Sequence, residues 1–135
     1  MGFAKSPIFP NAPVAAIANL PSASATDTTI YTAPATYGAV LMGPLLAFKQ
    51  GSATRTIDIK LTVGATTVTL ARVALSGAQY STVNLMSPEY IAGMSLSDPR
   101  LVIPPSGVLK ITTTDSNAGI VDVTGLNIGT YENAA

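Results

Sequence analysis

One hairpin signal constrains this fold more than any other feature of the chain: the stretch RTIDIKLTVGATTVTL at residues 55–70. From Ile57 to Val63 every second residue is apolar and the residues between them are polar, which is the period of a β-strand with one buried face. Gly64-Ala65 interrupts the pattern, and glycine at the first of two central positions is typical of a type II′ turn. The stretch therefore predicts two antiparallel strands joined by that turn.

The same turn predicts the register of the two strands. It places four pairs of residues opposite one another: Val63 and Thr66, Thr62 and Thr67, Leu61 and Val68, and Ile59 and Leu70. One face then carries threonines and the other carries apolar pairs, so the turn chemistry and the hydrophobic pattern agree. Val73 and Leu75 are apolar on the opposite parity, and we expect a bulge or the end of the strand between Ala71 and Val73.

Strand-like runs occupy most of the chain from Thr28 onward. They are short and separated by turn residues, which favours a sandwich or barrel of antiparallel strands. We expect an all-β fold, an eight-stranded jelly-roll-like β-sandwich. Besides the hairpin, the runs are one from Thr28 that stops at Ala33-Pro34, a long apolar run that begins at Gly38, Tyr80–Met86, Leu101–Ile103, GVLKITTTD at residues 107–115, and residue 120 to about 131.

Two further local features are expected. Ser87-Pro88-Glu89 offers a serine that suits an N-cap and a proline that suits the first helical position. One short helix is predicted to begin there and to end at Gly93. In the last strand the apolar parity changes between Val123 and Leu126, and Gly125 between them predicts a bulge.

Residues 1–26 are expected to form an extended N-terminal arm before a β-sandwich domain at residues 27–135. Four prolines prevent a continuous helix and withhold backbone donors from a sheet. Yet the arm is rich in apolar residues, which a disordered tail usually lacks. We expect it either to fold back on its own domain or to reach onto a neighbouring subunit. Its expected assembly contacts are Phe3, Ile8, Phe9, Val14 and Ile17.

The chain is poor in the groups that most enzymes use. It has no His and no Cys, so it lacks the usual general base near neutral pH, a thiolate nucleophile and Cys-based metal ligands. Charged residues make up 10% of the chain, and seven basic residues balance seven acidic ones. We therefore expect no enzymatic activity, no metal or other cofactor, and no affinity for nucleic acid. No apolar run approaches the roughly 18 residues of a membrane span, so no membrane association is expected.

Two places hold charged side chains that could serve a site. Asp98 and Arg100 flank Pro99, and they would form a binding loop or an ion pair across subunits, or else an ordinary solvated turn. Glu89 with Tyr90 could begin a catalytic pair only if a second carboxylate lay nearby.

Two other places have a turn or an aromatic pair. Asp115, Asn117 and Gly119 loosely resemble a metal loop, but no further ligands and no terminal Glu follow, so we expect a turn between two strands. Tyr31 and Tyr37 flank the Pro34 corner. They would form either an exposed aromatic corner or two half-buried strand ends.

Four segments of the chain together match a known pattern: Ile30–Ala35, Ile57–Leu75, Pro105–Ile111 and Val121–Gly125. They resemble small β-sandwich virion proteins of tailed bacteriophages. In that family a Leu/Ile-Tyr-Thr-Ala/Val-Pro-Ala segment precedes the first long core strand, a hairpin strand rich in Thr and Val follows, and Pro-x-Gly-x-Leu-x-Ile/Val and Val-x-Val/Ile-x-Gly strands come near the end. The resemblance covers about residues 26–132. It departs from the family pattern at Thr36-Tyr37, in the insertion Ser87–Pro99 and in the arm.

The resemblance implies a structural role in a virion. Family members serve as capsid decoration or cement proteins, head fibres, or tail and baseplate accessories, often as trimers. It therefore implies a homo-oligomer, with a trimer favoured, that is made in the host cytoplasm and binds the major capsid protein or another virion protein. The alternatives are a tail, collar or baseplate component, or a glycan-binding module for host adhesion, which the scarcity of aromatic residues disfavours.

Overall fold

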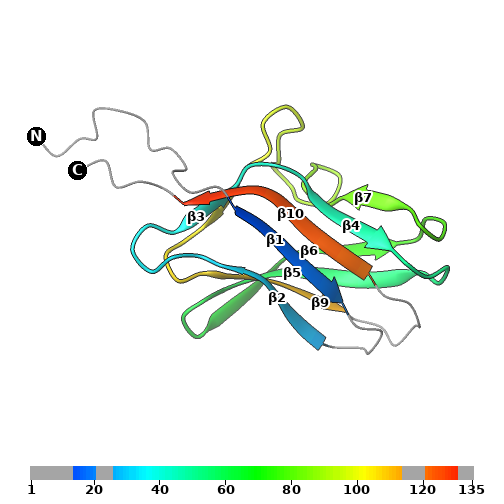
Figure 1. Cartoon of the computed structure of the whole chain (residues 1–135), viewed down its shortest axis with the longest axis horizontal. Helices are drawn as coiled ribbons and strands as arrows, with labels where there is room; N and C mark the ends of the chain where they lie inside the picture. The colour runs from blue at the N-terminus through cyan, green and yellow to red at the C-terminus, as the bar shows by residue number, and fades with distance from the viewer. Residues whose placement is uncertain (1–13, 21–25, 114–120, 131–135) are drawn as a thin grey trace, which may run out of the picture.

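The computed structural model describes residues 14–20, 26–113 and 121–130, and those residues form strands, turns and loops without a helix (Figure 1). Every strand pairing is antiparallel, as the alternating hydrophobic pattern predicts. The ten strands of the described residues are β1 (Val14–Leu20), β2 (Thr26–Thr32), β3 (Ala39–Leu41), β4 (Leu45–Lys49), β5 (Arg55–Val63), β6 (Thr66–Leu75), β7 (Thr82–Asn84), β8 (Leu101–Ile103), β9 (Val108–Thr113) and β10 (Val121–Thr130).

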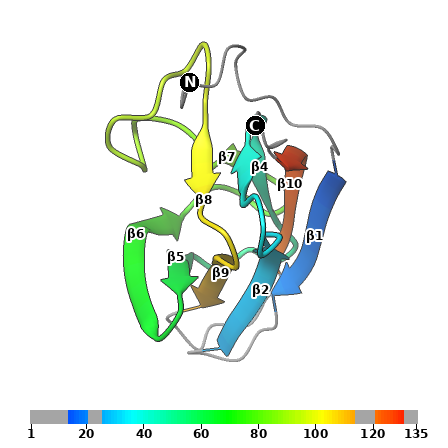
Figure 2. The ribbon, with the colours of Figure 1, turned by 90° about the vertical axis from the view of Figure 1, so that its left-hand side faces the viewer.

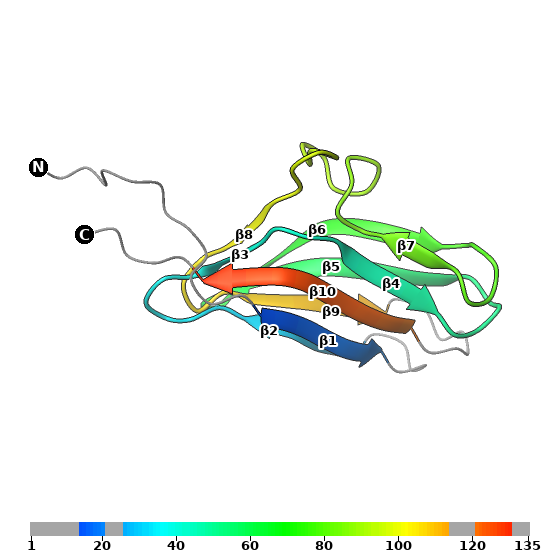
Figure 3. The ribbon, with the colours of Figure 1, turned by 45° about the horizontal axis from the view of Figure 1, so that its top comes forward.

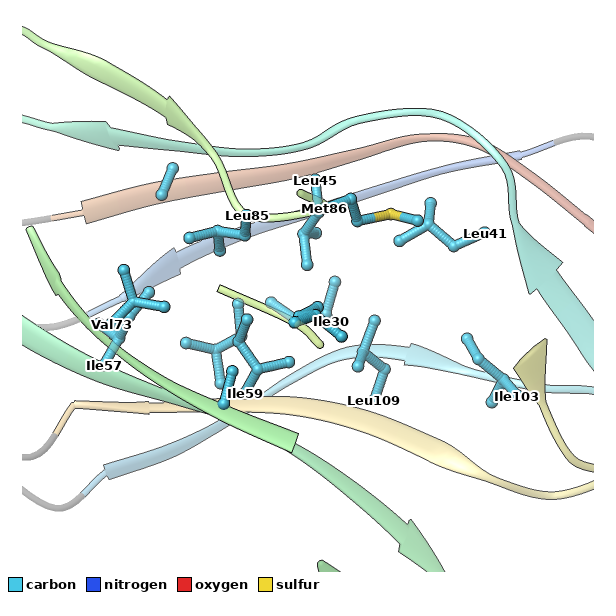
Figure 4. Packing of buried hydrophobic residues seen from close by; sticks show 14 of the residues in the cluster. Ile30, Leu41, Leu45, Ile57, Ile59, Val73, Leu85, Met86, Ile103 and Leu109 are labelled. Carbon is cyan, nitrogen blue, oxygen red and sulfur yellow. The ribbon is translucent and has the colours of Figure 1, made fainter. Parts of the chain in front are cut away.

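Two sheets make up this β-sandwich (Figures 2 and 3). The four-stranded sheet has the order β2-β9-β5-β6. In the six-stranded sheet, β10 pairs with β1 on one side and with both β4 and β3 on the other, while β7 and β8 add to β4 and β3. Apolar side chains from both sheets fill the space between them, among them Leu41 and Leu45 from one sheet and Ile57, Ile59 and Leu109 from the other (Figure 4).

The long apolar run that begins at Gly38 forms two strands instead of the single strand expected. β3 ends at Leu41 and β4 begins at Leu45. Gly43-Pro44 lies between them, and a proline cannot donate a backbone hydrogen bond to a neighbouring strand. The two pieces pair with successive halves of the same strand, β10, so the sheet continues across the break.

The predicted hairpin is confirmed. Val63 pairs with Thr66, Thr62 with Thr67, and Leu61 with Val68. Gly64 has a φ of +62°, and Ala65 is not among the residues with positive φ, which is the pattern of a type II′ turn.

The bulge of this hairpin lies closer to the turn than expected. Ile59 pairs with Ala71, not with Leu70, because Leu70 is the extra residue on β6. The shift turns Ala71, Val73 and Leu75 toward the core, where all three are buried. β6 therefore continues as a strand through Ala71–Val73.

The short helix expected at Ser87-Pro88-Glu89 is not present. The Ser87 carbonyl accepts hydrogen bonds from the backbone N–H groups of Tyr90 and Ile91, which makes one turn that does not continue. Gly93 follows with a φ of +84°. Ile91 and Met94 are buried against the core, so tertiary packing, rather than local helix signals, determines this segment. The strand expected at Tyr80–Met86 is likewise shorter and covers only β7.

Part of the segment expected to be an arm is a strand of the sandwich. β1 pairs along its length with β10, which places the backbone of Val14 and Ile17 in the six-stranded sheet. Phe3, Ile8 and Phe9 lie outside the described residues. On β10, the predicted bulge beside Gly125 is confirmed, because Ala16 pairs with Gly125 whereas Val14 pairs with Ile128.

Candidate functional site

The charged candidates do not converge on a site. Asp98 and Arg100 form an ion pair within their own loop, with 3.2 Å between Asp98 Oδ1 and Arg100 Nε, and both side chains are exposed. Glu89 is exposed, and Tyr90 packs against the core. Asp115, Asn117 and Gly119 lie outside the described residues. Within the described ranges, no group of three or more His, Cys, Asp or Glu side chains could hold a metal ion, and no helix could cross a membrane.

Two proline-containing loops are joined at one end of the sandwich. The Ala33 N–H donates to the Gly107 carbonyl at 2.8 Å. The Pro34 carbonyl accepts from two backbone N–H groups, those of Gly38 at 3.1 Å and Ser106 at 3.2 Å. These bonds extend the pairing of β2 with β9 beyond its last pair, so the loops after β2 and before β9 form one unit, which we call the proline corner (residues 33–38 and 104–107).

The turn at Pro104–Gly107 has the pattern of a type II turn. The Gly107 N–H donates to the Pro104 carbonyl at 2.8 Å, Pro105 occupies the first central position, and Ser106 at the second has a φ of +59°. Glycine is the usual residue at that second position, so the backbone of Ser106 is somewhat strained there.

Gly38 is required by the corner for two separate reasons. Its φ is +70°, a backbone conformation that is energetically unfavourable for residues with a Cβ. A Cβ at this position would also lie 2.7 Å from the Ile103 carbonyl oxygen, a backbone atom that cannot move aside. The glycine thus lets β3 start directly against the end of β8.

Exposed apolar side chains occur in the proline corner and on strands near it in the fold. Tyr37 lies in the corner itself, and Val102 lies on β8, two residues before Pro104. Val63 and Val68 lie beside the tip of the β5–β6 hairpin, where β5 pairs with the start of β9 and β6 is the next strand outward. Each of these four side chains, which we call the corner surface, is more than 40% exposed: Tyr37 42%, Val63 42%, Val68 47% and Val102 60%.

The length of the β5–β6 hairpin explains why the apolar side chains near its tip are exposed to solvent. Along the inner face of β5, Ile57 and Ile59 are fully buried, Leu61 is half-buried and Val63 is exposed. The apolar pattern thus continues beyond the point where the opposite sheet covers it. Exposed apolar patches of this kind mark interaction sites more often than chance, whereas single exposed apolar residues need no explanation.

The outer face of the four-stranded sheet is polar and internally paired. Asp27, Thr112, Asp58 and Arg72 lie opposite one another across all four strands. Arg72 donates two hydrogen bonds to Asp58, at 2.7 and 2.9 Å, and Thr112 donates one to Asp27. The hydrogen bond from Arg72 is the main reason that the pKa of Asp58 is lowered, although burial opposes it. The hydrogen bond from Thr112 lowers the pKa of Asp27 in the same way.

Two lysines lie directly opposite each other on the same face. Lys60 of β5 pairs with Lys110 of β9, an arrangement that is unfavourable by itself. Asp27 offsets it, because its Oδ1 lies 3.7 Å from the Lys60 Nζ and both lysines favour its ionised form. The face is therefore close to neutral and its charged groups already have partners.

Among the described residues, the opposite end of the sandwich carries two uncharged loops, residues 50–54 and 76–81. Tyr80 lies there with a φ of +67° and is 64% exposed. Its ring stacks on Phe48 of β4, with 6.2 Å between ring centroids. Lys49 is buried beneath the loops, and its Nζ donates to the Gly77 carbonyl at 2.6 Å.

Two tyrosines are exposed among the described residues, Tyr37 and Tyr80, and the sequence predicts only the first as a candidate. Tyr37 is exposed at the proline corner, but Tyr31 packs against the core, and burial raises its pKa. The aromatic corner therefore has one ring, not two. Tyr80 was assigned to a strand, and the only available signal against that was the surrounding run SGAQYST, whose small and polar residues are typical of a loop.

Comparisons with protein-family models, curated proteins and solved structures gave no match.

Proposed function

We propose that this chain is a structural, non-enzymatic virion protein of a tailed bacteriophage, a capsid cement or decoration protein that binds and stabilises the major capsid protein shell. The motif resemblance is the starting point. One observation carries the proposal further: two of the four resembling segments, Ile30–Ala35 and Pro105–Ile111, are hydrogen-bonded to each other in the proline corner and in the β2–β9 pairing. These two segments therefore form one structural unit, although they are far apart in the sequence.

The strand order supports the finer part of the proposal, a jelly-roll. If β3 with β4 and β7 with β8 each count as one interrupted strand, the described residues form eight strands. Numbered in chain order, the sheets become 1-8-3-6 and 2-7-4-5, which is the arrangement of two interlocked Greek keys. Such sandwiches commonly occur in viral capsid proteins.

The corner surface is the attachment face in this proposal. Its backbone is held by cross-loop hydrogen bonds, so the exposed apolar side chains lose little conformational entropy on binding. β1 begins at the same end, because Val14 pairs with Ile128, which pairs with Leu41 of β3. An arm formed by the preceding residues, with Phe3, Ile8 and Phe9, would start beside this face and could add contacts to the shell or to a neighbouring copy.

The proposed partners follow from the motif resemblance. The protein would act as a homo-oligomer, with a trimer favoured, on the major capsid protein, without cofactor, nucleic acid or membrane. The place in the virion would be the capsid surface. The tail, collar or baseplate remains the alternative, and the number of copies per particle separates the two, because a shell offers far more equivalent positions than a tail.

The test measures binding of purified protein to phage heads that lack it. We expect the double variant Tyr37→Ser with Val68→Ser to bind at least about tenfold more weakly, since both removed side chains are apolar contacts. Leu96→Ser is the matched control, because Leu96 is 73% exposed but lies in the loop between β7 and β8. Deleting residues 2–13 should also weaken binding while the sandwich stays folded. Equal binding by wild type, double variant and control would contradict the attachment face, and a copy number typical of a tail would contradict the capsid position.

A further inference from the structure

The backbone of Tyr80 is held in a conformation that tyrosine disfavours. Among the described residues only Tyr80 and Ser106 have a positive φ without being glycine, and for a bulky residue this conformation is strained. Three hydrogen bonds surround it: Tyr80 N–H to the Lys49 carbonyl at 2.8 Å, Lys49 N–H to the Ser81 carbonyl at 3.0 Å, and the Gln79 side-chain amide to the Gln50 carbonyl at 3.0 Å. Strain that the surroundings maintain in this way is concentrated at functional sites in proteins.

The result of this conformation is an aromatic ring with one covered face and one open face. The Tyr80 ring stacks on Phe48 at an interplanar angle of 23°, and Tyr80 nevertheless stays 64% exposed. Phe48 is half-buried on the outer side of β4, so it supports the ring from a regular strand. The hydrogen bonds fix the backbone, Phe48 fixes the ring, and the remaining face points to solvent.

The loops around this ring carry hydrogen-bonding groups but no exposed charge. Residues 50–54 are QGSAT and residues 76–82 are SGAQYST. Lys49 and Arg55, which flank the first of these loops, are each 1% exposed, and Lys49 donates to the Gly77 carbonyl. A ligand that lies on the open face of Tyr80 would therefore meet amide and hydroxyl groups, which suits an uncharged ligand rich in hydroxyls.

We propose that Tyr80, supported by Phe48, is the stacking platform of a binding site for a neutral pyranose unit of a glycan. A pyranose has one apolar face of C–H groups, which can lie on an aromatic ring, and hydroxyls at its edge, which can bond to side chains such as those of Gln79 and Thr82. A protein partner fits less well, because Tyr80 is the one large apolar side chain exposed on these two loops of the described structure. Protein interfaces need a wider apolar centre. This site is separate from the corner surface, so the inference does not depend on the proposed virion role.

The experiment is a titration of the isotope-labelled full chain with neutral trisaccharides of glucose, galactose and N-acetylglucosamine, followed by NMR. An open site of this size should bind weakly, with a Kd on the order of 1 mM. We expect the amide signals of Gln79, Tyr80 and Thr82 to shift on saturation with at least one sugar. The proposal is overturned if no sugar shifts them at concentrations up to about 50 mM, which is far above that Kd.

Three variants decide whether the ring itself binds. Tyr80→Asn keeps a residue that tolerates positive φ but removes the ring, and it should raise the Kd at least about tenfold. Tyr80→Phe keeps the ring and should change the Kd by no more than about threefold. Leu96→Ser, which removes an exposed apolar side chain elsewhere, should leave the Kd unchanged. Unaltered binding by Tyr80→Asn, or tighter binding of acidic sugars than of neutral ones, would contradict the proposal.

Discussion

Among the described residues, each end of the sandwich has one non-glycine residue with positive φ, and the two are held in that conformation by different means. Ser106, at the proline corner, occupies a position that its turn type assigns to such a residue, after Pro105 and before Gly107. Tyr80, at the other end, lies in a loop whose sequence does not require the conformation, and long-range bonds to Lys49 maintain it.

At the proline corner the strained backbone stabilises the fold, whereas at the other end it positions an exposed side chain. At the corner, the strained residue lets two loops bond to each other, and the exposed apolar groups are on neighbouring elements. At the loop end, the strained residue is itself the exposed group. A substitution at the corner should therefore act mainly on stability, whereas one at Tyr80 should act mainly on binding.

The largest effect is expected at the corner from Gly38→Ala. The substitution combines an unfavourable φ with a contact to the Ile103 carbonyl, and it should lower the free energy of unfolding by about 3 kcal/mol in urea titrations. Gly64→Ala is the matched control, because Gly64 has a similar φ but no atom within 4 Å of an added Cβ. It should cost only about 1 kcal/mol. Equal losses would mean that the close approach at the corner does not matter.

The polar outer face of the four-stranded sheet lies between the two ends, and the stability that Asp58 contributes there should depend on pH. Asp58→Asn should cost about 1 kcal/mol at pH 7, because Asp58 is buried whereas its partner Arg72 is exposed to screening solvent. The pKa of Asp58 is lowered on folding from its ordinary value of 3.8, so its contribution is present above that value and is lost as the pH falls through the lower folded pKa. The wild-type and variant unfolding curves should therefore converge in acid.

The matched control for the pH experiment is Asp98→Asn. Asp98 also pairs with an arginine, but both partners are exposed, so the variant should lose less stability than Asp58→Asn. A difference between wild type and Asp58→Asn that persists below the folded pKa would show that packing of the side chain, not its charge, is responsible.

A smaller gain is expected from Ser106→Gly. Glycine adopts the φ of this position without strain, and the relief should outweigh the extra entropy of the unfolded chain by about 0.5 kcal/mol. The urea concentration at the midpoint of unfolding should rise, and the slope of the free energy of unfolding against urea concentration should stay the same. A loss of stability would mean that the Ser106 side chain contributes more than the backbone strain costs.

The smallest effect on stability is expected from Tyr80→Asn. Asparagine tolerates positive φ, which offsets the lost stacking on Phe48, so the free energy of unfolding should change by less than about 0.5 kcal/mol. Thermal and urea unfolding measure this directly. A loss as large as that of Gly38→Ala would make the two ends alike and would remove the distinction drawn between them.

The sequence predicted those parts of the fold in which local chemistry and hydrophobic pattern agree. The β5–β6 hairpin, its type II′ turn and its register as far as Leu61 and Val68 follow from Gly64 and the alternation around it. The bulge at Leu70 could not be located, because several apolar residues in a row give more than one register with a buried face. Only packing against the opposite sheet selects Ala71 as the partner of Ile59.

The predicted helix and the misplaced bulge were wrong because tertiary contacts override local signals, whereas the break between β3 and β4 lies at a local signal, Gly43-Pro44. Ser87-Pro88-Glu89 has good helix-start residues, but burial of Ile91 and Met94 shapes the segment into turns. The same limit applies to the sites. Tyr37 was recognisable because a proline corner is visible in the sequence, whereas the conformation of Tyr80 depends on bonds to Lys49, which lies 31 positions earlier on β4.

The place of β10 has a consequence for how the chain is made. β10 pairs with β1, β3 and β4, and its partner in β1 comes from the other extreme of the described residues. During synthesis on the ribosome β1 has no partner in the six-stranded sheet until β10 has emerged, and until then β3 and β4 can pair only with β8 and β7. Contacts between residues so far apart in sequence form slowly, and unpaired strands invite association with other chains in the meantime. Productive folding should therefore start only after β10 has left the ribosome, and stalled or truncated chains should aggregate.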